Sequence, residues 1–428
     1  MSSSETMSSI ERKKLHSRQR TLENRCYFAL RLEAFFIALN PWIASGALAL
    51  GVAFLFWRWM RDPEFHFRRL PYDVPVIFFV VIGGASVLVA PDRMASFYNY
   101  YVLVGSYVFT YLLAGQTLRT EKHLRGVLKS LGYSAFCCVL YGFCQLAFGW
   151  DMNAADTKWV DGEAFPELKK RIFSTWKNPN IFAGYLGEVI AVVFAFFMTE
   201  EDSGGRRKYG VALLTLLGCL ALTYARGACF AVMLTLACYG ALKDRRILLV
   251  CAAVGAALLV ADPVLADRLM SVFTKMDTSM EMRLALWESS VAMIMDHPLL
   301  GIGWGSFLKV YPEYDFYINN AATEMFHAHN LYLHYAAEIG VIGAAAYFWY
   351  FFGTMFTAFR SSGTEESFLV RRFELGCGLA LVTVALGGIS DNVLFNIPSS
   401  MLLWMGCALA MAARGILPES SRKHKTEE

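Results

Sequence analysis

Long apolar runs alternate with short charged links along almost the whole chain. A helix that crosses a bilayer needs roughly 20 apolar residues, and fewer where it is short. The pattern therefore predicts an all-α polytopic membrane protein with about twelve transmembrane helices. The predicted spans are 27–40, 42–57, 74–90, 97–115, 126–148, 178–198, 209–224, 227–242, 247–262, 329–357, 375–390 and 397–413.

The basic residues supply an orientation for these spans. With the N-terminus in the cytoplasm, 27 of the 39 Lys and Arg residues fall in the inside segments, and every inside segment holds at least three. This asymmetry is the positive-inside bias of membrane proteins. Both termini are therefore expected in the cytoplasm.

Two outward segments are longer than simple turns. A basic N-terminal tail, 1–26, is followed by the first nine spans over 27–262, which include an outer loop at 149–177. A large outer loop at 263–328, the last three spans over 329–413 and a cytoplasmic tail at 414–428 complete the chain. Loops longer than about 12–15 residues tend to be functional or disordered.

The larger loop carries an amphipathic stretch, MRLALWESSVAMIMDHP, at 282–298. Its Leu284, Trp287, Val291, Ile294 and Met295 share one helical stripe. We expect this stretch to form a helix that packs over the outer mouth of the membrane domain.

The first two predicted spans have an alternative. Residues 34–57 could form one long helix instead of a hairpin that turns at Asn40-Pro41. Proline disfavours helical conformation in the residue before it, and one helix would place a basic segment on the wrong side of the membrane. These considerations favour the hairpin.

Composition narrows the class of protein further. The chain is 56% hydrophobic and only 18% charged, whereas soluble domains carry about 25% charged residues. A formal net charge of +3 without a long basic block argues against a nucleic-acid partner. Membrane lipid is the expected surrounding.

Two arginines on the outer side are candidates for binding an anion. Arg226 lies in the short turn TYARG between two apolar runs, where a lone charge is costly unless it is paired or binds a ligand. Snorkelling to lipid headgroups is its structural alternative. Arg283 begins the amphipathic stretch, and there a solvated helix charge is the alternative. Together, two arginines could hold a diphosphate in bidentate fashion.

Three histidines gather where the tenth span begins, in FHAHNLYLHYAAEIGVIG at 326–343. His327, His329 and His334 lack the i, i+4 spacing and the cysteine support typical of zinc sites, so we expect no metal and no cofactor. A histidine at the membrane boundary suits general-base chemistry, because the unperturbed side chain titrates near pH 6.5. Anchoring of the helix at the interface is the alternative. Asp391 and Asn392 indicate no more than an outer turn.

With these motifs in view, the sequence resembles the O-antigen ligase / O-antigen polymerase superfamily of bacterial envelope enzymes. The resemblance rests on the turn TYARG, the RLALW helix with Arg283 and Trp287, the run DHPLLGIGWGSF at 296–307, and HAHNLYLHYAAEIGVIG. The NPN start of the sixth span, with Asn180, is similar as well.

This resemblance implies a GT-C-like fold and a metal-independent, inverting glycosyltransferase at the periplasmic face of the bacterial inner membrane. The outer loops 149–177 and 263–328 would then be periplasmic loops. The donor would be a glycan on undecaprenyl diphosphate, and the acceptor the lipid A-core of lipopolysaccharide. Arg226 and Arg283 would bind the diphosphate, and His329, which precedes the Asn of the His-Asn pair, would be the catalytic base, with His327 as the other candidate. His327, Asn330, Glu338, Trp287 and Asn180 would support the site.

Within the superfamily, the acceptor distinguishes ligases from polymerases and from protein O-oligosaccharyltransferases. The polymerase pattern places Gly eleven residues after an outer Arg, but Arg171, Arg226 and Arg283 are followed at that offset by Phe182, Ala237 and Ile294. This favours the ligase. A transporter of lipid-linked anions is the rival from another class, and it would distribute its charges along several helices near the bilayer midplane.

Overall fold

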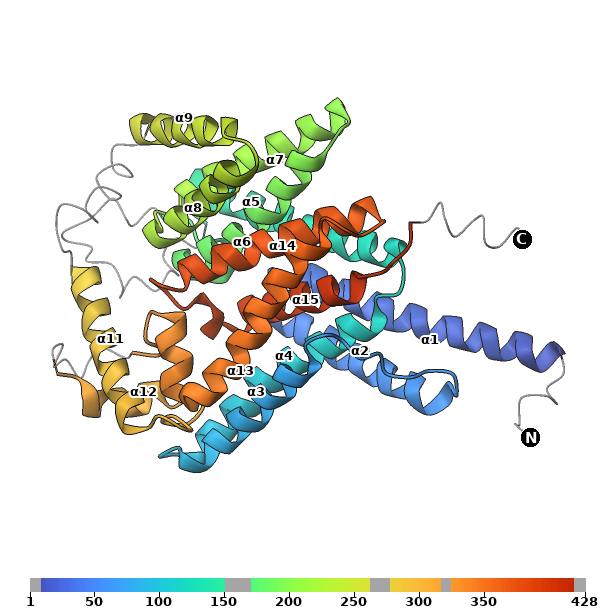
Figure 1. The fold of residues 1–428 in the computed structure, drawn as a ribbon, viewed down its shortest axis with the longest axis horizontal. Coiled ribbons are helices and arrows are strands. Elements are labelled where there is room, and N and C mark those ends of the chain that lie inside the picture. The colour runs from blue at the N-terminus through green and yellow to red at the C-terminus, as the bar shows by residue number, and fades with distance from the viewer. Residues whose placement is uncertain (1–8, 151–170, 262–277, 317–324, 419–428) are drawn as a thin grey trace.

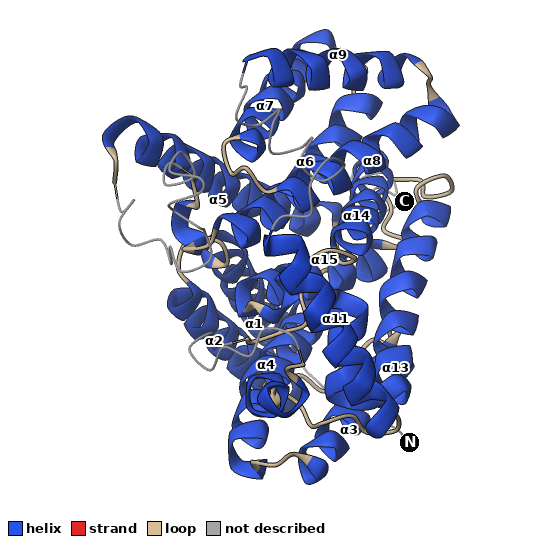
Figure 2. Ribbon diagram, turned by 90° about the vertical axis from the view of Figure 1, so that its left-hand side faces the viewer, coloured by secondary structure: helices blue, strands red, loops and turns tan. Residues whose placement is uncertain are grey.

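The structure is a computed structural model that describes residues 9–150, 171–261, 278–316 and 325–418. Throughout these ranges the regular elements are helices, which form a bundle (Figures 1 and 2). The long helices are α1 (Ser9–Phe36), α2 (Pro41–Arg61), α3 (Asp73–Ser86), α4 (Arg93–Thr117), α5 (Glu121–Phe148), α6 (Pro179–Thr199), α7 (Ser203–Ala221), α8 (Arg226–Lys243), α9 (Arg246–Ala261), α11 (Thr278–Asp296), α13 (Leu331–Ser361), α14 (Phe368–Gly387) and α15 (Ile397–Ala413). The short ones are α12 (Phe307–Val310) and the 3-10 turns η1 (Val87–Val89), η4 (Ser174–Trp176), η5 (Tyr311–Tyr314) and η6 (Val393–Phe395).

A helix occupies each of the twelve segments that the apolar runs predict. Among the described residues, four helices are long and apolar enough to cross a membrane by length and composition, namely α2, α5, α6 and α13. Three shorter apolar helices in the same ranges follow this pattern, at Asp73–Val89, Arg246–Ala257 and Ile397–Ala413. The described part of the chain is thus all-helical with membrane-helix character, and the number of crossings remains a prediction.

The first two helices form a hairpin that breaks where the sequence suggests. Asn40 caps α2, because its side-chain oxygen accepts hydrogen bonds from the backbone N–H groups of Trp42 (3.0 Å) and Ile43 (3.2 Å). Pro41 stands in the first turn of α2, where its missing N–H costs nothing. The helical segment before this break also reaches further back than expected, since α1 begins at Ser9, within the predicted tail.

The broken helix α13 holds the Gly-rich run 301–307 in place. Gly340 has a φ of 70° and a ψ of 172°, a backbone conformation that only glycine adopts readily. At the break, the carbonyl oxygens of Ala337 and Glu338 accept hydrogen bonds from the backbone of the Gly-rich run. Ile302 N–H donates to Ala337 O (2.8 Å) and Gly303 N–H donates to Glu338 O (3.0 Å). The Gly-rich run and α13 therefore form one packed unit.

Replacing Gly340 by alanine is expected to destabilise this unit by about 2–4 kcal/mol, from backbone strain plus overpacking. An added Cβ would clash with the backbone of Leu299 and Leu300. The measurement is the thermal unfolding midpoint of the purified protein in detergent. Gly105→Ala on α4 is the matched control, because its added Cβ would meet no atom within 4 Å. Equal midpoints for the two variants would contradict the prediction.

The predicted amphipathic helix is present as α11, which lies across the end of the bundle near the start of α13 (Figure 2). The helix does not bury the whole of its predicted apolar stripe against the bundle. Leu284, Val291 and Met295 are exposed, whereas Leu286 and Met293 on another face are buried against α13 and the Gly-rich run. Trp287 and Ile294 of the predicted stripe are half-buried, so one edge of the stripe faces outward while the other packs inward.

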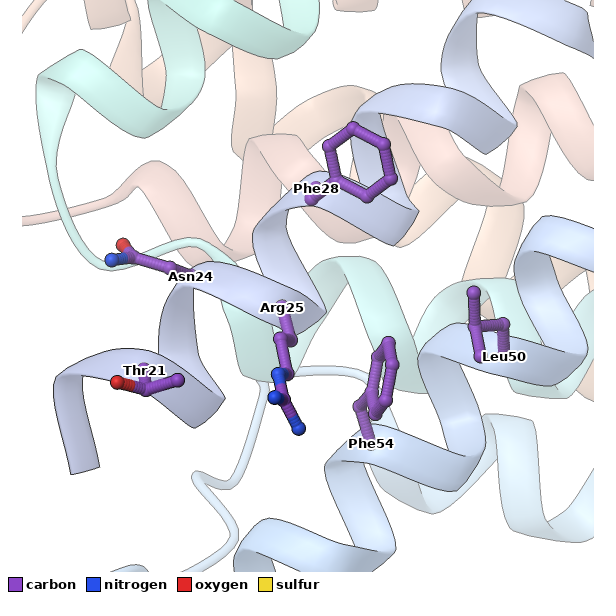
Figure 3. Close-up of a pocket in the computed structure, with 6 residues that line it drawn as sticks. All are labelled: Thr21, Asn24, Arg25, Phe28, Leu50 and Phe54. Atoms are coloured by element: carbon purple, nitrogen blue, oxygen red, sulfur yellow. The ribbon is translucent and has the colours of Figure 1, made fainter. Parts of the chain in front are cut away.

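A shallow hollow of about 380 Å³ lies between α1 and α2. Figure 3 shows the guanidinium of Arg25 pointing toward Phe54, whose ring centroid is 5.7 Å away. The residues that line this hollow come from the α1–α2 hairpin alone, so it is separate from the histidine cluster at the start of α13.

Candidate active site

His329 lies in the loop immediately before α13 and faces Asp391, 62 residues further along the chain. Its Nδ1 is 2.9 Å from Oδ1 of Asp391, and both side chains are about one-fifth exposed, at 19% and 18%. The φ of His329 is 48°, a left-handed conformation that non-glycine residues rarely adopt. A strained backbone at a partly exposed His–Asp pair is typical of a functional site.

Asn330 explains why this pair forms. Its side-chain oxygen caps α13 by accepting from the backbone N–H groups of Tyr332 and Leu333, both at 3.0 Å. Its Nδ2 donates to Ile389 O (2.9 Å), while the N–H of Leu331 donates to Gly388 O (2.7 Å). These bonds join the start of α13 to the loop after α14, two residues before Asp391.

The second histidine is in a different environment. His327 is buried, and its ring stacks on Phe395 with centroids 4.2 Å apart. Its Nδ1 accepts the backbone N–H of His329 at 3.1 Å. Burial holds the pKa of His327 well below its usual range, with the neighbouring His329 acting in the same direction. His327 is thus a neutral side chain that supports the loop.

The helix α11 supplies two more of the predicted residues. The indole Nε1–H of Trp287 donates to the backbone oxygen of His329 at 3.3 Å. Arg283 lies one turn earlier, and its charge contributes to lowering the pKa of both His327 and Asp391. The structure thus brings Arg283, Trp287 and the His329–Asp391 pair together.

The carboxyl of Asp391 is under opposing influences. Burial acts to raise its pKa, but His329 and Arg283 outweigh this and hold the pKa well below the usual range. Asp391 is therefore ionised at neutral pH. A depressed pKa in the folded state contributes stability that is present above the unfolded pKa, about 3.9, and is lost as the pH falls through the folded value.

This linkage predicts the pH dependence of an Asp391→Asn variant. The stability that wild-type protein has over the variant should persist at pH 5 and shrink only below about pH 4, where unfolded aspartate takes up its proton. Thermal unfolding of both proteins across pH 3–7 checks it. A difference that disappears already between pH 6 and 5 would contradict an ionised Asp391 in the folded state.

Arg226 stands at the first position of α8, against the same loop as Asp391. The residue after it, Gly227, packs so closely on Ser390 that an added Cβ would clash with the Ser390 hydroxyl. Tyr224, in the turn before α8, has a φ of 52° and is a second strained residue here. The chain thus places Arg226 at the same end of the bundle as His329 and Arg283.

Asn180 serves the architecture of this turn. Its side-chain oxygen accepts a hydrogen bond from Nη2 of Arg171 (2.7 Å), whose Nε donates to Thr223 O (2.7 Å). The buried Arg171 therefore ties the start of α6 to the turn that carries Arg226.

Glu338 likewise holds a loop. Its carboxylate accepts the backbone N–H groups of Gly305 (2.9 Å) and Phe307 (3.2 Å), so the N–H groups of the Gly-rich run serve an anion within the protein. Glu338 is buried and sits 3.7 Å from Nε2 of His334. These contacts hold the Gly-rich run and His334 in place, so Glu338 would support the site without touching the His329–Asp391 pair directly.

A metal-ligating geometry also arises at the site. One potential ligand atom from each of His327, His329 and Asp391 lies within 4.8 Å of the others. The Nδ1 atoms of both histidines are engaged, one by a backbone N–H and the other by Asp391. A metal would have to compete with these bonds or use the Nε2 atoms, so absence of metal stays a prediction that experiment must test.

Two residues of this region were missed by sequence reasoning. The sequence predicts only an outer turn at Asp391. It presents Arg171 only as an arginine that is not followed by glycine eleven residues later. Asp391 stands 62 residues after His329, and only the pairing of two loops brings them together. A charged residue in an outer turn next to the histidine-bearing span was the available signal.

Comparison with known protein families gives a match over part of the chain. A family model described as O-antigen ligase matches residues 211–348, a segment that includes Arg226, Arg283, His329 and Glu338. Asn180 and Asp391 lie outside this segment. No curated protein matches the chain.

Proposed function

We propose that this chain, whose residues 211–348 match a family model described as O-antigen ligase, has the activity of an O-antigen ligase. The enzyme would transfer a glycan from undecaprenyl diphosphate to the lipid A-core of lipopolysaccharide at the periplasmic face of the inner membrane. The observation that carries this proposal is the His329–Asp391 pair (2.9 Å) beside Arg283 and the N-terminus of α8.

The proposed reaction is a single displacement. An acceptor hydroxyl gives its proton to His329 while its oxygen forms a bond to the anomeric carbon of the donor sugar. The bond from that carbon to the diphosphate oxygen breaks, and undecaprenyl diphosphate leaves with the electron pair. Attack opposite to the leaving group inverts the anomeric carbon.

Asp391 has a defined part in this scheme. With Nδ1 of His329 donating to the ionised carboxylate, Nε2 keeps a lone pair for the acceptor proton. The imidazolium that forms is stabilised by the same carboxylate. His329 is favoured over His327 as the base, because His327 is buried and its Nδ1 already accepts a backbone N–H.

The arginines would act on the leaving group. Negative charge develops on the diphosphate as the glycosidic bond breaks, and a guanidinium can donate two parallel hydrogen bonds to it. Arg226 and Arg283 come from α8 and α11, so they could approach the diphosphate from two directions. Their position at one end of the bundle favours an enzyme at a membrane surface over a transporter with midplane charges.

The deciding experiment offers three acceptors side by side. Purified protein is mixed with undecaprenyl-diphosphate glycan and with lipid A-core, a second lipid-linked glycan, or a serine-rich pilin-like protein. Transfer to lipid A-core supports the ligase. Transfer only to the second glycan or to the protein would replace it by a polymerase or a protein O-oligosaccharyltransferase, and no transfer to any of them would overturn the enzyme proposal.

Metal removal should leave the transfer rate unchanged, because the proposed proton and charge transfers use side chains alone. The measurement is the initial rate before and after incubation with EDTA, with added Zn²⁺ or Mg²⁺ as the reverse test. Strong inhibition that Zn²⁺ restores would instead assign a metal to His327, His329 and Asp391.

A further inference from the structure

A large groove lies away from the His329 site, between α5 on one side and α6, α14 and α15 on the other. Its volume is about 870 Å³, within the range of ligand-binding pockets. Figure 1 shows α6 and α14 running together through the middle of the bundle with α15 beside them. The groove is lined from Phe368 to Val384 on α14, which corresponds to about 24 Å along that helix.

The interior of the groove is largely apolar. Its walls include Leu128 on α5, Val192 on α6, and Leu381 and Leu402 on the two C-terminal helices. Such a length of apolar wall matches most of the roughly 30 Å thickness of a bilayer's hydrocarbon core. The shape and chemistry therefore fit a hydrocarbon chain that lies parallel to the helices.

Two glycines keep the groove wide. Gly132 on α5 and Gly406 on α15 both line it, and a Cβ added at either would meet no atom within 4 Å. Glycine inside a helix costs about 1 kcal/mol relative to alanine, so helix stability alone favours a side chain at both positions. No described part of the chain uses the space that these glycines leave.

The mouth of the groove, near the N-termini of α5 and α14, carries charges of both signs. Two cations there are already paired, because Arg125 lies 2.6 Å from Glu121 and Arg372 lies 2.8 Å from Glu200. Lys129 and Glu366 also line the mouth and are exposed. Within the described residues, neither of these two has an ion-pair partner. The mouth therefore offers one cation and one anion to a ligand.

A further polar group faces the interior. Glu188 on α6 lines the groove and is only 8% exposed, and no hydrogen bond from a described residue reaches its carboxyl group. It stands eleven residues before the end of α6, about 16 Å along the helix. A buried carboxyl group without a partner is costly, and a ligand with polar groups below its head could supply one.

We propose that this groove binds one phospholipid of the phosphatidylethanolamine type. Its phosphate would lie at Lys129 and its ammonium at Glu366. An ester carbonyl would accept a hydrogen bond from the protonated carboxyl group of Glu188, and an acyl chain would follow the apolar wall past Gly132. In the orientation proposed above, this lipid belongs to the cytoplasmic leaflet, opposite the glycan-transfer site. The lipid site itself does not depend on the transfer reaction.

Native mass spectrometry of the delipidated full-length protein tests the proposal. Phosphatidylethanolamine, phosphatidylglycerol and phosphatidylcholine are titrated separately. Phosphatidylethanolamine should form a 1:1 adduct at a concentration at least about tenfold lower than the other two, which corresponds to about 1.4 kcal/mol. Equal binding of the three lipids, or tighter binding of an added polyprenyl phosphate, would overturn it.

Filling the groove provides the matched comparison. Gly132→Phe should abolish the adduct, whereas Gly46→Phe, at an exposed glycine of α2 with equally open space, should retain it. Lys129→Ala and Glu366→Gln should each weaken the preference for phosphatidylethanolamine. Should Gly132→Phe not fold, Gly406→Leu fills the groove from the other wall. Wild-type binding by a folded groove-filling variant would overturn the assignment.

Discussion

His329→Ala is expected to lower the rate of glycan transfer about 10²–10⁴-fold, which is the usual contribution of a general base, while the protein stays folded and inserted. The acceptor hydroxyl would lose the group that takes its proton. Donor binding should change little, because the proposed contacts to the diphosphate come from arginines on other helices. The measurement is the initial rate and KM for lipid-linked glycan with purified wild-type and variant protein.

A control variant separates this effect from a general disturbance of the outer face. His297→Ala removes an exposed histidine at the end of α11, and it should transfer at the wild-type rate. Asp391→Asn should resemble His329→Ala, since an amide can hold the ring in the wrong tautomer. Full activity of a folded His329→Ala protein would exclude this residue as the base.

Arg226→Ala is expected to reduce transfer about 10²–10³-fold, comparable to the removal of one donor from a charge-stabilising site. The loss should appear both in kcat and in the KM for the donor, because the diphosphate is charged before the reaction and more so as the sugar leaves. Transfer assays over a range of donor concentrations separate the two parameters.

Two further variants sharpen this test. Arg226→Lys keeps the charge but not the planar pair of donors, so its activity should lie between those of Arg226→Ala and the wild type. Arg207→Ala on α7 removes an exposed arginine from a predicted inside segment and should have no effect on transfer. If Arg226→Ala transfers normally while remaining folded, Arg226 is not a donor-binding residue.

The helices could be predicted because each depends on its own residues. Backbone polar groups cannot remain unpaired in a membrane, so an uncharged run of sufficient length forms a helix whatever its neighbours are. The break before α2 is equally local, since Asn40 supplies the cap and Pro41 cannot continue the preceding helix. The early start of α1 was not predicted, because the residues before 27 are polar.

The candidate site could be predicted only in part. Arg226, Arg283 and His329 are unusual by themselves, as polar groups at the ends of apolar runs. The proposed role of Asp391 follows only from its hydrogen bond to His329, which lies 62 residues earlier in the chain. That contact depends on the bond from Asn330 to Ile389, which joins the two loops. The sequence predicts α11 as an amphipathic helix that packs over the bundle, but which of its faces is buried depends on the packing of the Gly-rich run and of the kink in α13.

The bonds that Asn330 and Leu331 make to the loop after α14 place the two parts of the proposed site on different elements of the chain. The proposed base, His329, and its partner Asp391 are held by bonds between α13 and that loop. The two arginines come from the first turn of α8 and from α11. In the proposed enzyme, substitutions on α11 that keep Trp287, whose indole donates to the backbone of His329, are therefore expected to change donor binding more than proton transfer.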